Sequence, residues 1–167
     1  MPELHTEHHA ALATLLETIR PASLLLIDPN PEPLSAACRQ ALPADCRIEH
    51  LPQATPERLA QLGQFDLGVV ANTLEHLEPR QAGILLSRLR DVHTRRFVAL
   101  LPLGEDWPGL ISHWQVADLL GYGMSLLARY RSDGRPLGLF HYAIVSYKTT
   151  PDWFNSKYWA HPERWKP

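Results

Sequence analysis

No glycine precedes Gly63 in this chain of 167 residues. Loops that cradle a phosphate or a dinucleotide are normally glycine-rich, because glycine lets the backbone approach a ligand closely. Such a loop is therefore excluded from the region before this residue. The chain also has only two cysteines, Cys38 and Cys46. Two isolated cysteines do not make a disulfide framework, and they fit free thiols in a reducing cytoplasm, where we expect the protein to be located.

Strong net charge and long apolar runs are missing too. The formal net charge is −2, which gives no general attraction to nucleic acid or to an anionic membrane. The longest apolar runs, such as "FVALLPL", are too short to span a bilayer. The N-terminus has no basic region and its apolar residues are periodic, so we expect no signal peptide. The sequence contains no Walker loop, Gly-x-Ser-x-Gly elbow or paired-cysteine zinc motif.

The apolar pattern predicts strands that alternate with helices. The expected helices span residues 4–19, 32–42, 56–62 and 78–92, with a fifth near 110–120. The expected strands span residues 23–27, 46–51, 65–72, 95–103, 124–132 and 136–148. In the helix over 78–92, we expect Ile84, Leu85, Leu89 and Val92 to face inward. The turn "SDGR" between the last two strands contains the Asp-Gly pair that is typical of a β-hairpin.

This order predicts an open three-layer α/β sandwich around a mostly parallel sheet. We expect about four parallel strands, with the C-terminal hairpin adding antiparallel strands at one edge. In such folds a ligand binds outside the carboxyl ends of the strands.

One long stretch carries a family resemblance. "FDLGVVANTLEHLEPRQAGILLSRLRDVHTRRFVALLPLG" resembles the fourth strand, loop, helix and fifth strand of class I S-adenosylmethionine-dependent methyltransferases. Asp66 and the "LEHL" loop at residues 74–77 stand where that family has an Asp and a similar loop. The C-terminal "LLGYGMSLLARY…FHYAIVSYK" resembles the elements that close the methyltransferase sheet. The resemblance covers residues 22–148 and implies a methyltransferase-like (Rossmann-like) domain over 1–148.

The stretch "LLLIDPNPEPLSAACRQAL" resembles the family's second strand and helix, with Asp28 as the acid that binds the ribose. The strand and glycine loop that should precede it are absent. "DPNPEP" cannot replace that loop, because three prolines fix φ and remove three backbone donors. A parallel sheet cannot leave a gap at its centre, so we expect "SLLLID" to occupy the first-strand position with "CRIEHL" beside it. One βα unit would then be missing, and Asp28 would lie where the glycine loop normally begins.

The candidate site residues follow two strands. Asp28 and Asn30 follow the first, and we interpret them as cofactor-binding residues. Asp28 could instead make an Asx turn or cap the next helix. Asn72 and Glu75 follow the third strand as further cofactor-binding candidates, and His76 could act as a base or orient a substrate. The alternative is that Thr73 and Glu75 start a helix and that His76 is a solvated loop residue.

Two other groups have simpler explanations. His5, His8 and His9, with Glu7, have a spacing that could face a metal, but no fourth ligand is evident and a polar helix face explains them as well. The two cysteines lack a nearby His or Lys in the sequence, which favours buried packing over catalysis.

The tail at residues 149–167 is rich in aromatic side chains. The aromatic residues in it are Trp153, Phe154, Tyr158, Trp159 and Trp165. Rings of this size bury a large area when they dock, so we expect the tail to pack on its own domain or on a second subunit of a homodimer. Bases could stack on such rings, but Asp152 and Glu163 nearly cancel the positive charge, which disfavours nucleic acid.

These observations leave three hypotheses for function. The first is a divergent methyltransferase-like protein that has lost the standard cofactor loop and acts by binding or assembly. The second is an active methyltransferase that uses S-adenosylmethionine on a small molecule. The third and weakest is a nucleotide- or nucleic-acid-binding module. An enzyme should have a polar pocket around residues 28–31 and 72–76, whereas a degenerate fold should have that crevice filled by side chains, with residues 29–33 packed across it.

Overall fold

The computed structural model describes residues 4–144, and the side chains from residue 8 onward. The aromatic tail and the side chains of His5 and Glu7 lie outside the described residues. Within that part of the chain, no helix is long and apolar enough to cross a membrane.

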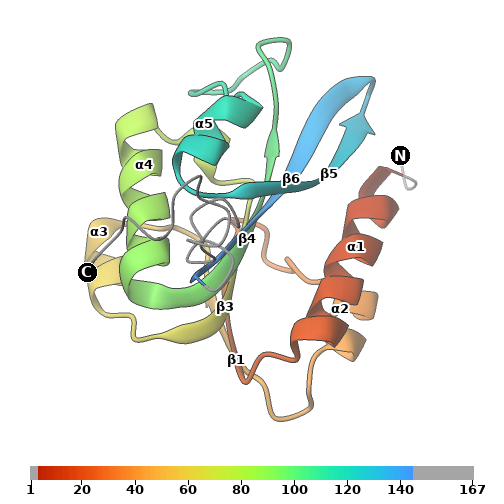
Figure 1. Cartoon of the computed structure of the whole chain (residues 1–167), viewed down its shortest axis with the longest axis vertical. Helices are drawn as coiled ribbons and strands as arrows, with labels where there is room; N and C mark the ends of the chain where they lie inside the picture. The colour runs from red at the N-terminus through yellow and green to blue at the C-terminus, as the bar shows by residue number, and fades with distance from the viewer. Residues whose placement is uncertain (1–3, 145–167) are drawn as a thin grey trace, which may run out of the picture.

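A six-stranded sheet forms the centre of the described part of the chain (Figure 1). Its strands are β1 Ser23–Ile27, β2 Arg47–Leu51, β3 Phe65–Ala71, β4 Thr94–Pro102, β5 Ser125–Ser132 and β6 Arg135–Ala143. They are arranged in the order β2-β1-β3-β4-β6-β5. The first four run parallel, and β6 pairs antiparallel with both β4 and β5. The predicted fold class, a mostly parallel sheet with a C-terminal antiparallel hairpin, is confirmed.

Strand β1 has the central position that the sequence predicted for it. It pairs with β2 on one side and with β3 on the other, so that Leu24 lies opposite both Ile48 and Leu67. Four of its five residues are buried, as expected of a short apolar strand that is covered on both faces. The carboxyl end of β1 is therefore surrounded by other strand ends.

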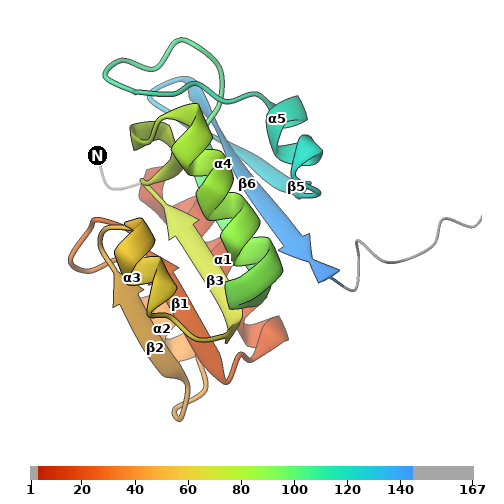
Figure 2. The same ribbon diagram turned by 90° about the vertical axis from the view of Figure 1, so that its left-hand side faces the viewer.

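Helices cover both faces of the sheet (Figures 1 and 2). Helices α1 (Leu4–Ile19) and α2 (Ala36–Ala41) lie on one face, and α3 (Pro56–Ala60), α4 (Pro79–Arg88) and α5 (Val116–Gly121) lie on the other. Each layer has its own apolar core. On the α1 face, Leu16 and Cys38 pack against strand residues such as Leu26 and Val98. The helix predicted over 4–19 is confirmed.

Two helices begin later than the sequence predicted. We expected a helix over 32–42, but α2 begins at Ala36, because prolines precede it and the Ser35 hydroxyl accepts the N–H of Cys38 as the N-cap. The helix expected near 110–120 begins at Val116, where Gln115 and Asp118 form a reciprocal capping box. In both cases the local side-chain cap determines the start of the helix.

The helix expected over 78–92 has two parts. It is α-helical in α4 and ends in a π-helical turn, η2, at Leu89–His93. Leu85 and Leu89 are buried as predicted, but Ile84 and Val92 are exposed, so their predicted inward position was wrong. The buried stripe includes Leu86, next to Leu85, in place of Ile84, and the wider π turn rotates Val92 away from the core.

The hairpin turn matches its sequence signal. Asp133 and Gly134 have φ values of 51° and 75°, which is the two-residue geometry with positive φ at both positions that Asp-Gly favours. Ser132 and Arg135 pair across it.

Candidate ligand-binding site

A cavity of about 340 Å³ lies at the carboxyl ends of the strands, on the face that α1 covers. This volume is at the lower end of the range typical of small-molecule sites. Its floor is apolar and comes from four strands: Leu26, Val69, Val98, Leu100 and Leu139. His8, His9 and Leu12 of α1 line it from the helix side. Among the described residues, no side chains fill this crevice, which is the result that we expected of an enzyme and not of a degenerate fold.

All five site residues predicted from the sequence line this cavity. They are Asp28, Asn30, Asn72, Glu75 and His76. The parallel topology explains why these residues lie together. Residues that follow β1 and residues that follow β3 lie at the same edge of the sheet, because parallel strands end on the same side. The two groups thus form a polar end next to the apolar floor.

Asp28 is 7% exposed and is held by several hydrogen bonds. Its Oδ1 accepts the N–H of Asn30 at 2.8 Å, and the Asn72 Nδ2 donates to both carboxylate oxygens at 3.4 Å. The Asp28 carbonyl accepts from His50 Nε2 at 2.8 Å. The Asx turn that we considered as the alternative role of Asp28 is therefore present.

The backbone N–H groups of the loop after β1 form hydrogen bonds within the loop itself. The N–H of Asn30 bonds to Asp28, and the N–H of Glu32 bonds to Asn30 Oδ1 at 3.1 Å. The prolines at residues 29, 31 and 33 have no N–H to offer. From residue 29 to residue 33, every backbone N–H that exists is bonded within the loop.

The turn after β3 holds Asn72 in an unusual backbone conformation. Its φ is +49°, in the left-handed region that Asn tolerates better than most residues. The next residue, Thr73, donates its hydroxyl to the carbonyl of Ala71 at 2.8 Å. This tight turn places Asn72 beside Asp28.

Glu75 is the most deeply buried polar residue of the polar end, at 3% exposure. It lies in a single 3-10 turn, η1 (Leu74–His76). Its backbone carbonyl accepts the N–H groups of Ile111 and Ser112 at 2.9 and 3.1 Å, so the loop after β4 covers the turn. The Ser112 hydroxyl also donates to the Leu74 carbonyl at 2.9 Å and accepts from Trp114 Nε1 at 2.8 Å.

The carboxylate of Glu75 is only partly satisfied. Its Oε2 is buried and has no hydrogen-bond partner among the described residues. Burial raises the pKa of Glu75, and the nearby charge of Asp28 raises it further. The backbone N–H groups of Glu75 and Thr73 and the neighbouring His76 oppose this increase. A buried acid with one unpaired oxygen is a strained arrangement that a ligand could relieve.

His76 lies at the rim of the cavity. It is solvent-exposed, which fits the solvated loop residue that we considered as one interpretation, although its side chain also lines the cavity. The predicted start of a helix at Thr73 and Glu75 takes the form of the short η1 turn, and the Thr73 hydroxyl does not cap it.

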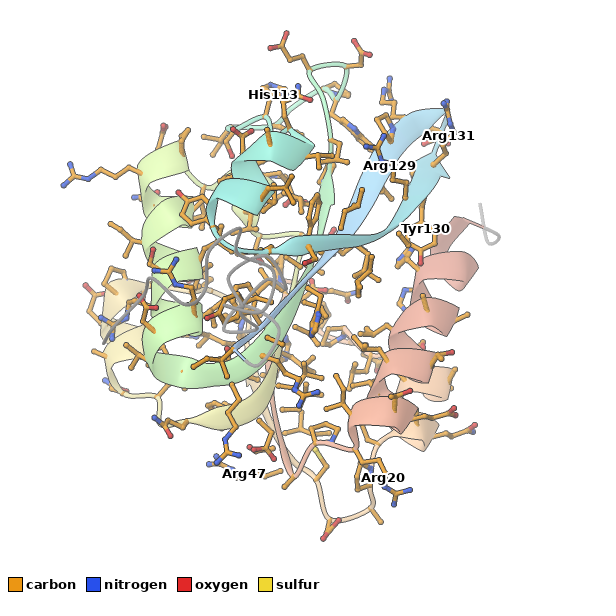
Figure 3. All side chains as sticks on the ribbon, viewed as in Figure 1. Arg20, Arg47, His113, Arg129, Tyr130 and Arg131 are labelled. Carbon is orange, nitrogen blue, oxygen red and sulfur yellow. The ribbon has the colours of Figure 1, made fainter. Side chains whose placement is uncertain are left out.

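Sequence reasoning missed three residues that line the cavity: His8, His9 and Trp107. The two histidine rings are 4.6 Å apart, and His8 meets the ring of Tyr130 edge-on at 6.0 Å; Figure 3 shows Tyr130 on β5 beside the N-terminal end of α1. The histidine spacing along α1 was visible in the sequence, where it indicated either a metal site or a polar helix face. Among the described residues, no group of three or more His, Cys, Asp or Glu could hold a metal ion.

One of the two cysteines has the buried position that the sequence favoured for both, whereas Cys46 is only partly buried. Cys38 is buried under α1. Burial, with the charges of Asp45 and Asp66, raises the pKa of the Cys46 thiol, which disfavours the reactive thiolate.

A family model matches residues 6–167 of the chain. The chain belongs to a family of unknown function, DUF6231. No curated protein matches it. This DUF6231 chain is similar in structure to class I methyltransferases at 12–14% identity, a level that shows the fold alone.

Three solved structures illustrate the likeness. Magnesium protoporphyrin IX methyltransferase from Synechocystis PCC 6803, with bound SAH, has a TM-score of 0.51 at 12% identity over 83% of this chain and 84% of that one. A Burkholderia thailandensis 1,6-didemethyltoxoflavin-N1-methyltransferase has a TM-score of 0.54 at 14% identity over 81% and 77%. The methyltransferase domain of bacterial CtHen1 has a TM-score of 0.53 at 12% identity over 84% and 100%.

Proposed function

We propose that this protein binds a small molecule in the cavity at the carboxyl ends of its strands and that it has lost the standard cofactor loop of the methyltransferase fold. The observation that carries the proposal is the loop after β1, whose backbone donors are already bonded within the loop. The cavity itself supports binding, because it joins an apolar floor to a small number of polar groups, which is the usual composition of a ligand site.

S-adenosylmethionine, the cofactor that the fold implies, does not fit this loop. A glycine loop presents free N–H groups and close backbone approach to its ligand. Here the positions that follow β1 are occupied by three prolines and two bonded N–H groups, and the carboxylate of Asp28 is engaged by Asn30 and Asn72. The residues that remain to receive a ligand are those of the rim and the floor.

Calorimetric titration with S-adenosylmethionine and S-adenosylhomocysteine tests the loss of the cofactor loop. We expect no heat of binding at millimolar concentrations of either compound. Binding in the micromolar range that disappears in Asp28→Ala would overturn the proposal. A Leu12→Trp variant, in which a larger ring projects from α1 into the cavity, serves as a second control, because it should abolish any binding that takes place there.

An active methyltransferase is the second candidate function. It is favoured by the meeting of Asp28, Asn72 and His76 at one cavity, since the family resemblance implies that these residues surround the cofactor and the substrate. In that case the chain's own residues would act mainly by positioning the acceptor, with His76 at the rim able to accept a proton from it. Micromolar binding in the titration above would make this candidate the leading one.

Assembly through the aromatic tail is the remaining part of the proposal. Its support is the composition of residues 149–167, with five large rings that each bury a substantial area when docked. A homodimer formed through the tail would combine this interface with a separate ligand cavity in each subunit.

A further inference from the structure

The described lining of the cavity contains acidic side chains but no permanently positive one. Two of the described residues that line the cavity are acidic, Asp28 and Glu75. Three are histidines, and none is Lys or Arg. A cavity with these walls has a negative end and an apolar floor. It therefore discriminates between ligands by the charge of their polar group.

Arg131 and Arg135 of the β5–β6 hairpin do not line the cavity. The Cζ atom of Arg135 lies 5.8 Å from the centroid of the Trp107 ring. Trp107 lines the cavity, whereas Arg135 does not. Arg131 is exposed and donates to the carbonyl of Gly134 at 3.0 Å. Figure 3 shows Arg20 and Arg47 at the opposite end of the molecule from the β5–β6 turn. No guanidinium among the described residues is thus in place to neutralise the cavity acids.

The carboxylates of Asp28 and Glu75 differ in the hydrogen bonds that they accept. Asp28 accepts hydrogen bonds from the loop and from Asn72. Glu75 retains a buried oxygen, Oε2, without a partner among the described residues. An unpaired buried acceptor is destabilising unless a donor reaches it, and a charged donor forms the stronger bond.

We propose that the ligand is an organic cation: a protonated amine on an apolar body, whose ammonium group binds Glu75 and whose apolar part lies on the floor formed by β1, β3, β4 and β6. The charge of Asp28 adds attraction, and its own hydrogen bonds keep it in place. The inference rests on the proposed small-molecule function and specifies the chemical class of its ligand. Binding requires no covalent step.

A matched series of small aromatic compounds tests the inference. The probes are 2-phenylethylamine, 2-phenylethanol and phenylacetate, which share a ring but carry a cation, a neutral hydroxyl and an anion. NMR titration of the full chain at neutral pH measures their affinities. We expect the amine to bind roughly tenfold or more tightly than the alcohol, and the acid to bind most weakly.

Two variants assign the effect to Glu75. Glu75→Gln keeps the shape of the side chain and should remove roughly tenfold or more of the amine affinity while changing that of the alcohol little. Glu49→Gln, at an exposed position of β2 that does not line the cavity, removes the same charge and should leave all three affinities unchanged.

The outcomes separate the inference from the proposed function. Equal binding of amine and alcohol that is abolished by Leu12→Trp would overturn the cation inference and keep the small-molecule function. An unchanged amine affinity in Glu75→Gln, or no binding of any probe at millimolar concentration, would also overturn the inference. The proposed loss of the cofactor loop is judged independently, by the titration with S-adenosylmethionine.

Discussion

Replacing Glu75 by Gln should stabilise the protein at neutral pH. In the native state this carboxyl is 3% exposed and its Oε2 has no partner among the described residues. In the unfolded chain the same group is fully hydrated. An amide of the same shape removes the buried charge and keeps one acceptor oxygen for the backbone N–H groups of Thr73 and Glu75, which lower the pKa of the carboxyl. Its NH2 group takes the position of the other oxygen.

The magnitude follows from the cost of burying an unpaired charged group, which exceeds the cost of about 1–3 kcal/mol for an unpaired neutral group such as the amide that replaces it. The N–H groups that oppose the pKa increase offset part of this cost, so we expect a gain of about 1–2 kcal/mol in the free energy of unfolding at neutral pH. For a domain of this size, each kcal/mol raises Tm by about 2–4 °C.

The sign of the pH dependence is determined by the raised pKa of Glu75. Protons bind more tightly to this carboxyl in the native state, so its contribution to stability is fully present below the unfolded pKa and is lost as pH rises through the folded pKa. The advantage of Glu75→Gln should therefore be largest at neutral and alkaline pH and should vanish as pH falls below 4.5, the ordinary pKa of a Glu side chain.

Urea unfolding across a series of pH values measures this difference directly. The control is Glu49→Gln, whose exposed side chain should give a change near zero at every pH. A Glu75→Gln protein that is less stable than wild type at neutral pH, or one whose advantage does not depend on pH, would refute the reasoning. Because the same variant should lose amine affinity, its two effects have opposite directions, as expected when a binding site stores strain.

Three further predictions concern the β3 strand, the turn after it and the tail. Gly68→Ala should lower stability by about 1–3 kcal/mol in urea unfolding, because a Cβ would lie 2.9 Å from Thr94 Cγ2. Asn72→Ala should lower stability by about 1 kcal/mol, since Ala tolerates the left-handed conformation poorly. A chain truncated after Thr150 should elute as a monomer in size-exclusion chromatography, whereas the full chain should elute as a dimer if the tail joins two subunits.

Each of these has its own control. Gly63→Ala meets nothing within 4 Å, so equal losses at Gly63 and Gly68 would contradict the steric explanation. Asn72→Gly keeps the left-handed conformation, and a Gly variant as unstable as the Ala variant would assign the effect to the lost hydrogen bonds to Asp28. A truncated chain that still elutes as a dimer would exclude the tail as the interface.

Local signals predicted most of the elements. Alternating apolar segments predicted the six strands, and the Asp-Gly pair predicted the hairpin turn, because both depend on interactions between near neighbours in the chain. The late start of α2 was also encoded locally, by the prolines that precede it and by the Ser35 cap. The exposed positions of Ile84 and Val92 could not be predicted as easily, because the π turn after α4 changes the helical period.

The sequence by itself determined that a glycine loop is absent before Gly63. It also determined that three prolines fix φ and remove backbone N–H donors in the loop after β1. It also determined that polar residues follow the first and third strands. Only the tertiary structure decided that Asp28, Asn72 and Glu75 meet at one cavity, that α1 contributes His8 and His9 to it, and that Glu75 is buried there. The physical reason is that burial and charge balance arise from segments far apart in the sequence, which become neighbours only when the sheet is assembled.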